Sequence, residues 1–378
     1  MSFFILPKFV LIYLCSFLDL KSHATFSLIN KKYYGTFFHI RELYTILLRQ
    51  KDPPINLDQS ISQIIKQSES YNSILHLICA DKNLSIEILQ LLINNKADLN
   101  LGDGRSDNIP LHYACKNENL SIEIIKYLID IKSDLNVKNK FGWAPLHCVC
   151  DNEFISIEMI KCLIENKSDL NAKNGYDQST PLHLASQNKN ISIEIIKHMV
   201  ESQADLNTKN RFNKIVLHYA CDKKNVSFEI IRYLVENKAD LNLKNVSDYT
   251  PFHLACENEN VSIEIIKYLV ENKSDINSRG FISLTPLHLA CEIENYSTEI
   301  IKYLVKNKSE LNLKNEYNET PLHCACENEN FSIEVIKYLI ENKSDINSKN
   351  IDNVSPLYII KENRNLFEKL SDCFGDYF

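Results

Sequence analysis

Histidine and cysteine recur along this chain in pairs with a fixed spacing, and both side chains can bind zinc. The histidines follow one another at 35 residues, with two steps of 36: His76, His112, His147, His183, His218, His253, His288 and His323. A cysteine stands three residues after each histidine except His183, where Ser186 takes its place: Cys79, Cys115, Cys150, Cys221, Cys256, Cys291 and Cys326. One such pair supplies only half of the ligands of a tetrahedral zinc site, and the next pair lies a full repeat away.

We therefore expect both residue types to be structural. The imidazole should hydrogen-bond to the backbone of the turn before the following helix, and the thiol should pack in the core as a small apolar group. Only His23, His39 and His198 lie outside the repeated position, and no nucleophile–base pattern, glycine-rich phosphate loop or pair of carboxylates accompanies them. The sequence predicts no enzyme, no metal and no cofactor.

The spacing is that of an internal repeat in which other residues also keep their places. Thr285–His288 opens one copy with Thr-Pro-Leu-His, Ser262–Leu269 lies in the middle of another, and Asp275–Asn277 closes it. A ninth, weaker copy begins at Ser355–Tyr358. A unit this short cannot bury a hydrophobic face by itself, so the copies must stack around one elongated core.

One copy shows how the repeated residues form two helices. Thr250-Pro251 starts the first helix, because proline in the first helical turn lacks an N–H that the helix does not need. Ser262 caps the second helix, whose apolar residues recur at helical spacing. Asp275-Ile276-Asn277 then leads into a projecting hairpin. With only 7 Gly in the chain, asparagine supplies many of the turns.

The period and the motif Thr-Pro-Leu-His-x-Ala resemble the ankyrin repeat. This unit is longer than the ankyrin unit of about 33 residues, and the extra residues fall between the two helices, as at Glu257–Val261. The resemblance implies an all-α solenoid of helix–turn–helix units with short β-hairpin loops, whose role is to bind other proteins. We expect eight repeats over residues 71–351, then a degenerate ninth repeat and C-terminal cap over residues 352–378.

The first 40 residues do not share the repeat, and residues 5–38 resemble an F-box. The resemblance runs through Leu6-Pro7, Val10-Leu11, Leu14, Ser16–Asp19, Ser27–Lys31 and Tyr33-Tyr34. The sequence departs from the F-box pattern at Phe9, where an acidic residue is usual, at His23, where leucine is usual, and by having tyrosine in place of tryptophan near the end.

The F-box resemblance implies a helical unit over residues 1–40 that binds a Skp-type adaptor of a cullin–RING ubiquitin ligase. The residues expected to bind the adaptor are apolar: Leu6, Pro7, Val10, Leu11, Leu14, Phe17 and Leu18. The alternative is a helical cap over the open end of the first repeat, which solenoids require. Residues 41–70 are expected to form a connector that caps this repeat.

The opening apolar run, Phe3–Leu18, resembles a signal peptide or membrane span only superficially. Pro7 and Lys8 interrupt it, Asp19 ends it, and no small-residue cleavage site follows. We expect neither membrane insertion nor secretion.

Composition limits the partners and the compartment. The net charge of −7 argues against a surface for nucleic acid. The 12 Cys could not be joined by disulfides without disrupting a regular stack, so we expect a reducing compartment: the cytoplasm, with the nucleus as an additional location. We expect a monomer apart from its partners. The enrichment in Asn, Lys and Ile carries no functional signal.

The repeats differ most at the tips of the projecting loops, where a partner would be chosen. The candidate partner-binding residues there are Phe141, Trp143, Tyr176, Arg211, Phe212, Tyr249, Phe281 and Tyr317, joined by Tyr113 and Tyr219 just after a repeated histidine. Aromatic residues and arginine are enriched at binding hot spots. The alternative is that these rings pack against neighbouring loops.

A charge gradient accompanies the tips, because the middle copies are basic and the later ones acidic. The basic residues are Lys189, Arg211, Lys214, Lys223 and Lys224, and the acidic residues are Glu257, Glu259, Glu292, Glu294, Glu327 and Glu329. A partner surface with two poles of opposite charge would fit this gradient. Two functions remain open: a substrate receptor of a ubiquitin ligase, and a protein-binding scaffold without a link to ubiquitin.

Overall fold

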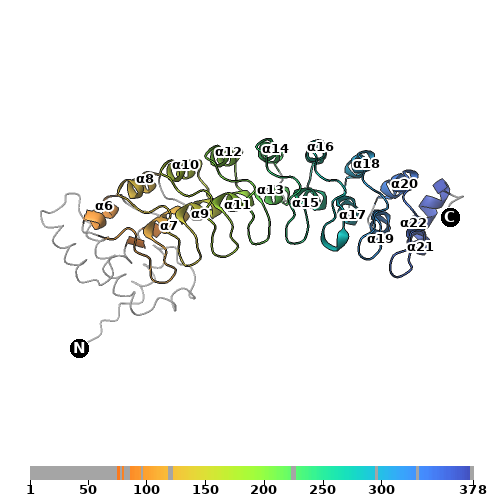
Figure 1. Ribbon diagram of the computed structural model, residues 1–378, viewed down its shortest axis with the longest axis horizontal. Coiled ribbons are helices and arrows are strands. Elements are labelled where there is room, and N and C mark those ends of the chain that lie inside the picture. Colours follow the sequence, from red (N-terminus) through yellow and green to blue (C-terminus); the bar gives the residue numbers. More distant parts are fainter. Residues whose placement is uncertain are drawn as a thin grey trace, which may run out of the picture. The chain divides into compact units, whose positions relative to one another are not determined.

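The structure is a computed structural model that describes residues 75–76, 79–80, 86–94, 97–117, 122–222, 227–293, 297–328 and 332–374. The chain divides into two compact units, Met1–Asp169 and Leu170–Phe378. Within each unit the described helices come in antiparallel pairs, and a loop projects before the first helix of each pair (Figure 1). None of the described residues belongs to a strand, so the predicted all-α fold is confirmed.

In the first unit the described helices are α6 (Ile86–Asn94), α7 (Pro110–Lys116), α8 (Ile122–Asp130), α9 (Pro145–Asp151) and α10 (Ile157–Glu165). First helices pack on first helices and second helices on second helices, as α7 does on α9 and α8 on α10. This is the contact pattern of stacked helix pairs.

The second unit repeats this pattern. Its first helices are α11 (Pro181–Gln187), α13 (Val216–Cys221), α15 (Pro251–Glu257), α17 (Pro286–Glu292), α19 (Pro321–Glu327) and α21 (Pro356–Glu362). Its second helices are α12 (Ile193–Glu201), α14 (Phe228–Glu236), α16 (Ile263–Glu271), α18 (Thr298–Lys306), α20 (Ile333–Glu341) and α22 (Arg364–Phe374). A short 3₁₀ turn, η1 (Phe281–Ser283), lies in the loop before α17.

Helix starts follow the sequence prediction. Among the first helices α7, α9, α11, α13, α15, α17, α19 and α21, all open on the repeated proline except α13, where Val216 takes its place. Among the described serines that precede second helices, the hydroxyl accepts the third residue's N–H only at Ser156 and Ser227. Ser262 occupies the same place without making that bond.

The second helices α8, α10, α12, α14, α16, α18 and α20 are each followed by a left-handed residue that is not glycine. These residues, with φ between 69° and 76°, are Lys132, Lys167, Gln203, Lys238, Lys273, Lys308 and Lys343. A side chain with a Cβ is strained in this conformation. The fold must therefore compensate for it in every repeat.

The asparagine that closes the preceding repeat, usually within an Asp-Leu-Asn or Asp-Ile-Asn motif, offsets this strain by hydrogen-bonding to the backbone at the left-handed residue. The Asn242 amide donates to the Lys273 carbonyl at 3.3 Å, and its Oδ1 accepts the Asp275 N–H at 2.9 Å. The same pair of bonds is made by Asn100, Asn136, Asn171, Asn207, Asn277 and Asn312. One residue type thus ties the left-handed turn of each repeat to its neighbour within the unit.

We predict that Asn242→Ala lowers the free energy of unfolding by about 1–2 kcal/mol, because one side chain makes two hydrogen bonds that alanine cannot. Chemical denaturation of the full chain measures the change. Asn347→Ala is the matched control, since the described residues show Asn347 bonded only through its backbone N–H to Asp345. Equal losses in the two variants would show that the bridge contributes nothing.

The last helix pair, α21 and α22, has fewer buried apolar residues than the pairs before it. Leu366 and Leu370 are buried on α22, and Tyr358 replaces the repeated histidine and is exposed. Only Asn363 separates α21 from α22, so the expected interhelix loop is shortened to one residue.

Candidate partner-binding surface

Both ring nitrogens of the repeated histidine form hydrogen bonds to backbone groups. Nδ1 accepts the N–H of the residue before the first helix, as Thr250 donates to His253 at 3.1 Å. Nε2 faces a carbonyl 31 residues further on, in the next copy: His218 to Tyr249 at 3.1 Å and His288 to Glu319 at 3.1 Å. The first of these bonds was expected from the sequence, whereas the second was not. Because Nδ1 accepts, Nε2 must carry the proton as a donor, which leaves no nitrogen for a metal.

Burial holds these imidazoles neutral. It lowers the pKa of His218, His253 and His288 to about 4, although the hydrogen bonds to backbone groups act in the opposite direction. Burial also lowers the pKa of His112, His183 and His323. Protonation would place a charge inside the stack and remove the acceptor at Nδ1.

We predict that acid weakens the stack through these histidines. They are neutral in the folded chain and titrate near pH 6.5 when unfolded, so the unfolded chain binds more protons as the pH falls. Their contribution is complete above about pH 6.5 and is lost as the pH falls toward about 4. Denaturation of the wild type and of His253→Gln at several pH values measures this. The variant should lose less stability between neutral pH and pH 5, and an identical loss in both chains would contradict the assignment.

The repeated thiols are packed rather than reactive. Burial raises the pKa of Cys79 to about 12, and it also raises the pKa of Cys256 and Cys291. A buried, protonated thiol is neither a nucleophile nor a metal ligand. Within the described residues, no group of three or more His, Cys, Asp or Glu could hold a metal ion.

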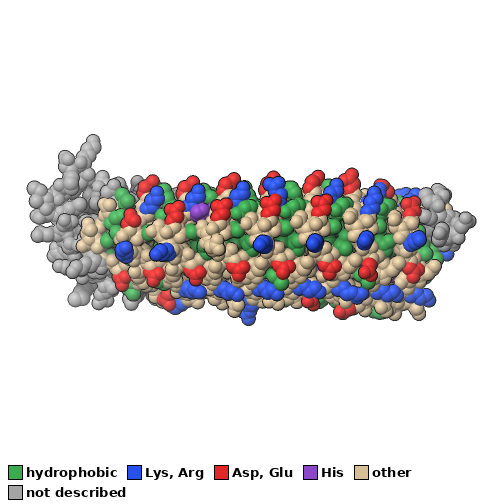
Figure 2. Space-filling view, turned by 45° about the horizontal axis from the view of Figure 1, so that its top comes forward, with side chains coloured by type: hydrophobic (Ala, Val, Ile, Leu, Met, Phe, Trp, Pro, Cys, Tyr) green, Lys and Arg blue, Asp and Glu red, His purple; other side chains and the backbone are tan. Residues whose placement is uncertain are grey.

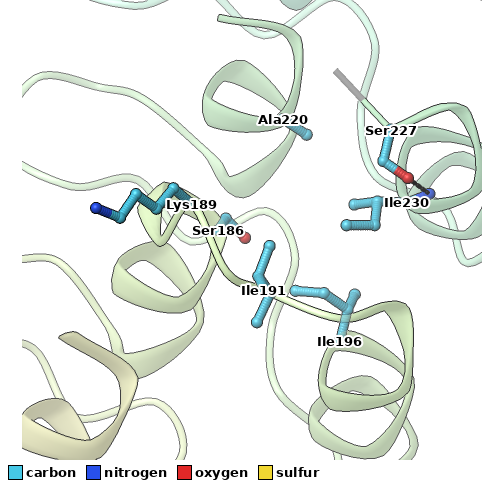
Figure 3. A pocket seen from close by; sticks show the side chains of 7 residues that line it. All are labelled: Ser186, Lys189, Ile191, Ile196, Ala220, Ser227 and Ile230. Carbon is cyan, nitrogen blue, oxygen red and sulfur yellow. Dashed lines mark hydrogen bonds between the residues drawn. The ribbon is translucent and has the colours of Figure 1, made fainter. Parts of the chain in front are cut away.

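Ser186, the one replacement in the cysteine position, lines a cavity of about 50 Å³. Its side chain is 3% exposed, and its hydroxyl has no hydrogen-bond partner among the described residues. The cavity is otherwise lined by Lys189, Ile191, Ile196, Ala220, Ser227 and Ile230, with isoleucines from two helices and a loop facing the serine (Figure 3). An unpaired buried hydroxyl beside empty space destabilises this joint between repeats.

We predict that Ser186→Cys raises the free energy of unfolding by about 1 kcal/mol, because it removes an unpaired hydroxyl and fills part of the cavity with a larger, less polar atom. Ser227→Cys is the matched control on the same cavity. Its hydroxyl accepts the Ile230 N–H at 3.4 Å, so its loss should destabilise the chain. A lower denaturation midpoint for Ser186→Cys would contradict the packing argument.

The projecting loops, here called fingers, are tight turns built on a buried asparagine. In the finger of residues 210–214, Asn210 Oδ1 accepts the N–H groups of Phe212 and Lys214 at 2.9 and 3.0 Å. Asn139, Asn245, Asn315 and Asn350 do the same in their fingers. Neighbouring fingers share a single backbone bond, such as Val246 N–H to the Phe212 carbonyl at 3.0 Å. The expected hairpins are therefore turns without a β ladder among the described residues.

Six of the sequence-predicted partner-binding residues point to solvent from these tips. Phe141, Tyr176 and Phe281 are 60, 77 and 59% exposed, and Arg211, Phe212 and Tyr317 are exposed as well. Val246 and Ile351 occupy equivalent tips and are 60 and 58% exposed. The sequence-based prediction did not include these two, because its candidates were aromatic residues and arginine and both of these are aliphatic.

The other four candidates are held within the stack. Tyr249 stacks on His253 with ring centroids 5.2 Å apart, and Lys116 lies 5.2 Å from the centre of the Trp143 ring. The Tyr113 hydroxyl donates to Asp103 at 2.6 Å, and the Tyr219 oxygen accepts from Asn210 at 2.7 Å. All four rings are partly buried, so they offer a partner less surface than the tips do.

Gly280 makes room for Tyr249. It stands where the other fingers carry their asparagine, and a Cβ at this position would lie 2.3 Å from Tyr249 Cδ1. The finger that follows is accordingly different, with Ile282 and Ser283 at positive φ.

The second helices carry rows of Lys and Glu on their exposed side (Figure 2). The lysines lie over tyrosine rings of the next copy: Lys197 over Tyr233, Lys267 over Tyr303 and Lys302 over Tyr338, at 5.6–5.9 Å. Such cation–π contacts contribute about 0.5–1 kcal/mol at exposed sites. This face of the second helices has a structural role.

The candidate adaptor-binding residues Leu6, Pro7, Val10, Leu11, Leu14, Phe17 and Leu18 lie outside the described residues. Among the residues that are described, no helix combines the length and the apolar character needed to cross a membrane.

Comparison with protein families finds one match over most of the chain. A family model described as "Ankyrin repeats (3 copies)" matches residues 46–139, 119–210, 188–280 and 281–350. The first match begins inside the segment expected to be a connector, and residues 5–38 lie outside all four. No curated protein matches the chain.

Proposed function

Because the chain belongs to the ankyrin-repeat family, whose repeats are protein-interaction modules, we propose that its repeats hold a target protein against the exposed finger tips. The observation that supports this most is that one finger tip per repeat exposes an apolar or aromatic residue: Phe141 in the first unit, and Tyr176, Phe212, Val246, Phe281, Tyr317 and Ile351 in the second. Singly exposed apolar residues are ordinary, but within the second unit one such residue recurs in consecutive repeats.

The tips are suited to binding because their backbone is fixed before a partner arrives. Most are held by an asparagine that accepts two N–H groups of its own finger, as Asn315 does for Tyr317 and Glu319 at 2.9 Å, whereas Gly280 stands in that place below Phe281. A surface ordered in advance loses less entropy on association. Aromatic side chains at such points are frequent hot spots.

We further propose that this chain is the substrate receptor of a ubiquitin ligase. Residues 5–38 resemble an F-box, so we place a Skp-type adaptor there and the protein to be ubiquitinated on the repeats. The buried cysteines of the described residues, none of which forms a disulfide, support a reducing compartment, and we propose the cytoplasm. The second candidate is an ankyrin scaffold without a ubiquitin link, in which the N-terminal segment only caps the first repeat.

We predict that a Skp-type adaptor co-purifies with the full chain from its native cell and is lost from Leu6→Ala/Pro7→Ala. The physical reason is that this double variant removes apolar contact area from the segment that resembles the adaptor-binding helix. Phe281→Ser/Tyr317→Ser is the matched control on the repeats: it should keep the adaptor and lose the target. Quantitative mass spectrometry of the captured proteins provides the measurement.

If no adaptor is captured by the wild-type chain, the ligase proposal fails and the scaffold remains. If the tip variant captures the same proteins in the same amounts as the wild type, the repeats do not bind through their fingers.

A further inference from the structure

We propose that the partner of the second unit presents a segment of alternating basic and apolar residues to the fingers between Val246 and Ile351. This inference rests on the proposed function, because it names the chemistry of the partner at the same tips. Two features of four consecutive copies carry it: an apolar row and an acidic strip beside that row.

The apolar row consists of Val246, Phe281, Tyr317 and Ile351, one from each of four consecutive fingers. Their side chains are 60, 59, 44 and 58% exposed. The last three fingers are joined by backbone bonds, from Glu316 N–H to the Ile282 carbonyl at 2.9 Å and from Ile351 N–H to the Tyr317 carbonyl at 3.0 Å. The spacing of the row is therefore set by the stack.

The acidic strip consists of Glu257, Glu292 and Glu327, which end α15, α17 and α19, together with Glu319 in the finger before α19. In the preceding copy the equivalent carboxylate, Asp222, is neutralised by Lys214, whose Nζ lies 3.0 Å away. Lys214 stands eight residues before Asp222. In the next three copies that position holds Tyr249, Leu284 and Glu319. Among the described residues, no cation pairs with the strip.

The strip reaches the base of the fingers at Glu319, whose Oε2 accepts a hydrogen bond from the Asn315 amide at 2.9 Å. The negative charges of Glu257 and Glu292 act on the Tyr249 phenol, whose pKa burial and these charges raise to about 12. Partial burial raises the pKa of Glu292, and so do the charges of Glu257, Glu319 and Glu327. Burial also raises the pKa of Glu257 and Glu327. These carboxylates repel one another and weaken the stack, as groups kept for binding often do.

One lysine of the basic pole is compensated within the chain: Lys214 pairs with Asp222 and also lies 5.2 Å from the centre of the Tyr219 ring. Lys223 and Lys224 of that pole lie outside the described residues. The acidic strip, which forms no ion pair within the described part of the chain, has charge left for a partner. Opposite charge across an interface speeds association and selects the partner.

An extended segment matches this pair of features. Successive side chains of a strand point to opposite sides, so apolar side chains can face the tips while lysine or arginine side chains reach the strip. Polyanions such as nucleic acid would be repelled from the strip. The occupant we infer is thus a basic, apolar stretch of a protein.

A phage library of short random peptides, selected on the full chain, tests the inference. We expect the enriched peptides to carry excess lysine or arginine with interspersed apolar residues. Glu257→Gln/Glu292→Gln/Glu327→Gln should weaken the best peptide at least tenfold, which corresponds to about 1.4 kcal/mol. The same variant should unfold at a higher temperature, because it removes repulsion, so loss of binding cannot come from misfolding. Glu229→Gln/Glu264→Gln/Glu299→Gln, with the same change in charge on the second helices, is the matched control and should bind as the wild type does.

Neutral or acidic enriched peptides, no enrichment, or equal weakening in the two triple variants would each overturn the inference. If captured proteins are lost from Phe281→Ser/Tyr317→Ser but bind Glu257→Gln/Glu292→Gln/Glu327→Gln as they bind the wild type, this inference fails and the proposed function stands. If captured proteins bind Phe281→Ser/Tyr317→Ser as they bind the wild type, the proposed function fails.

Discussion

A neutral histidine that bonds to two repeats at once is the interaction on which this structure depends. Through Nδ1 the ring accepts the N–H that precedes its own helix, and through Nε2 it meets a carbonyl of the next copy, as His253 does with Thr250 and Leu284. A buried donor and a buried carbonyl would each destabilise the fold if left unpaired. One side chain pairs both, so the position of each helix within its unit is tied to the finger of the copy that follows.

Asparagine side chains likewise pair backbone N–H and carbonyl groups elsewhere in the repeat. It occupies three places: the base of the finger, the turn before it, and the end of the first helix, where Asn258 donates to the Cys221 carbonyl at 3.1 Å. In the turn and at the end of the first helix it reaches a neighbouring copy, and at the finger base it holds its own turn. The abundance of asparagine carried no functional signal in the sequence, and its role in the structure is to satisfy backbone groups where glycine is scarce.

These constraints leave the chain little freedom outside the finger tips and the ends of the first helices. Residues fixed by stacking, such as His288 and Cys291, cannot distinguish one partner from another. The tips can, because the asparagine below holds the backbone whatever side chain stands above it. A row of exposed residues, and a strip of carboxylates that form no ion pair with the described residues, can therefore vary without loss of the fold.

The sequence by itself determined the period, the helix starts and the structural nature of His and Cys. Those features are local: proline, serine and apolar spacing act within one copy, and the family match agrees with them. Only the tertiary structure decided what crosses from copy to copy, because residues 31 to 36 apart must be brought together before their atoms can be paired. It placed His253 Nε2 against Leu284, separated the exposed Phe281 from the stacked Tyr249, and showed that Lys214 is neutralised whereas Glu292 is not. Exposure and charge compensation depend on neighbours in space, which no single repeat contains.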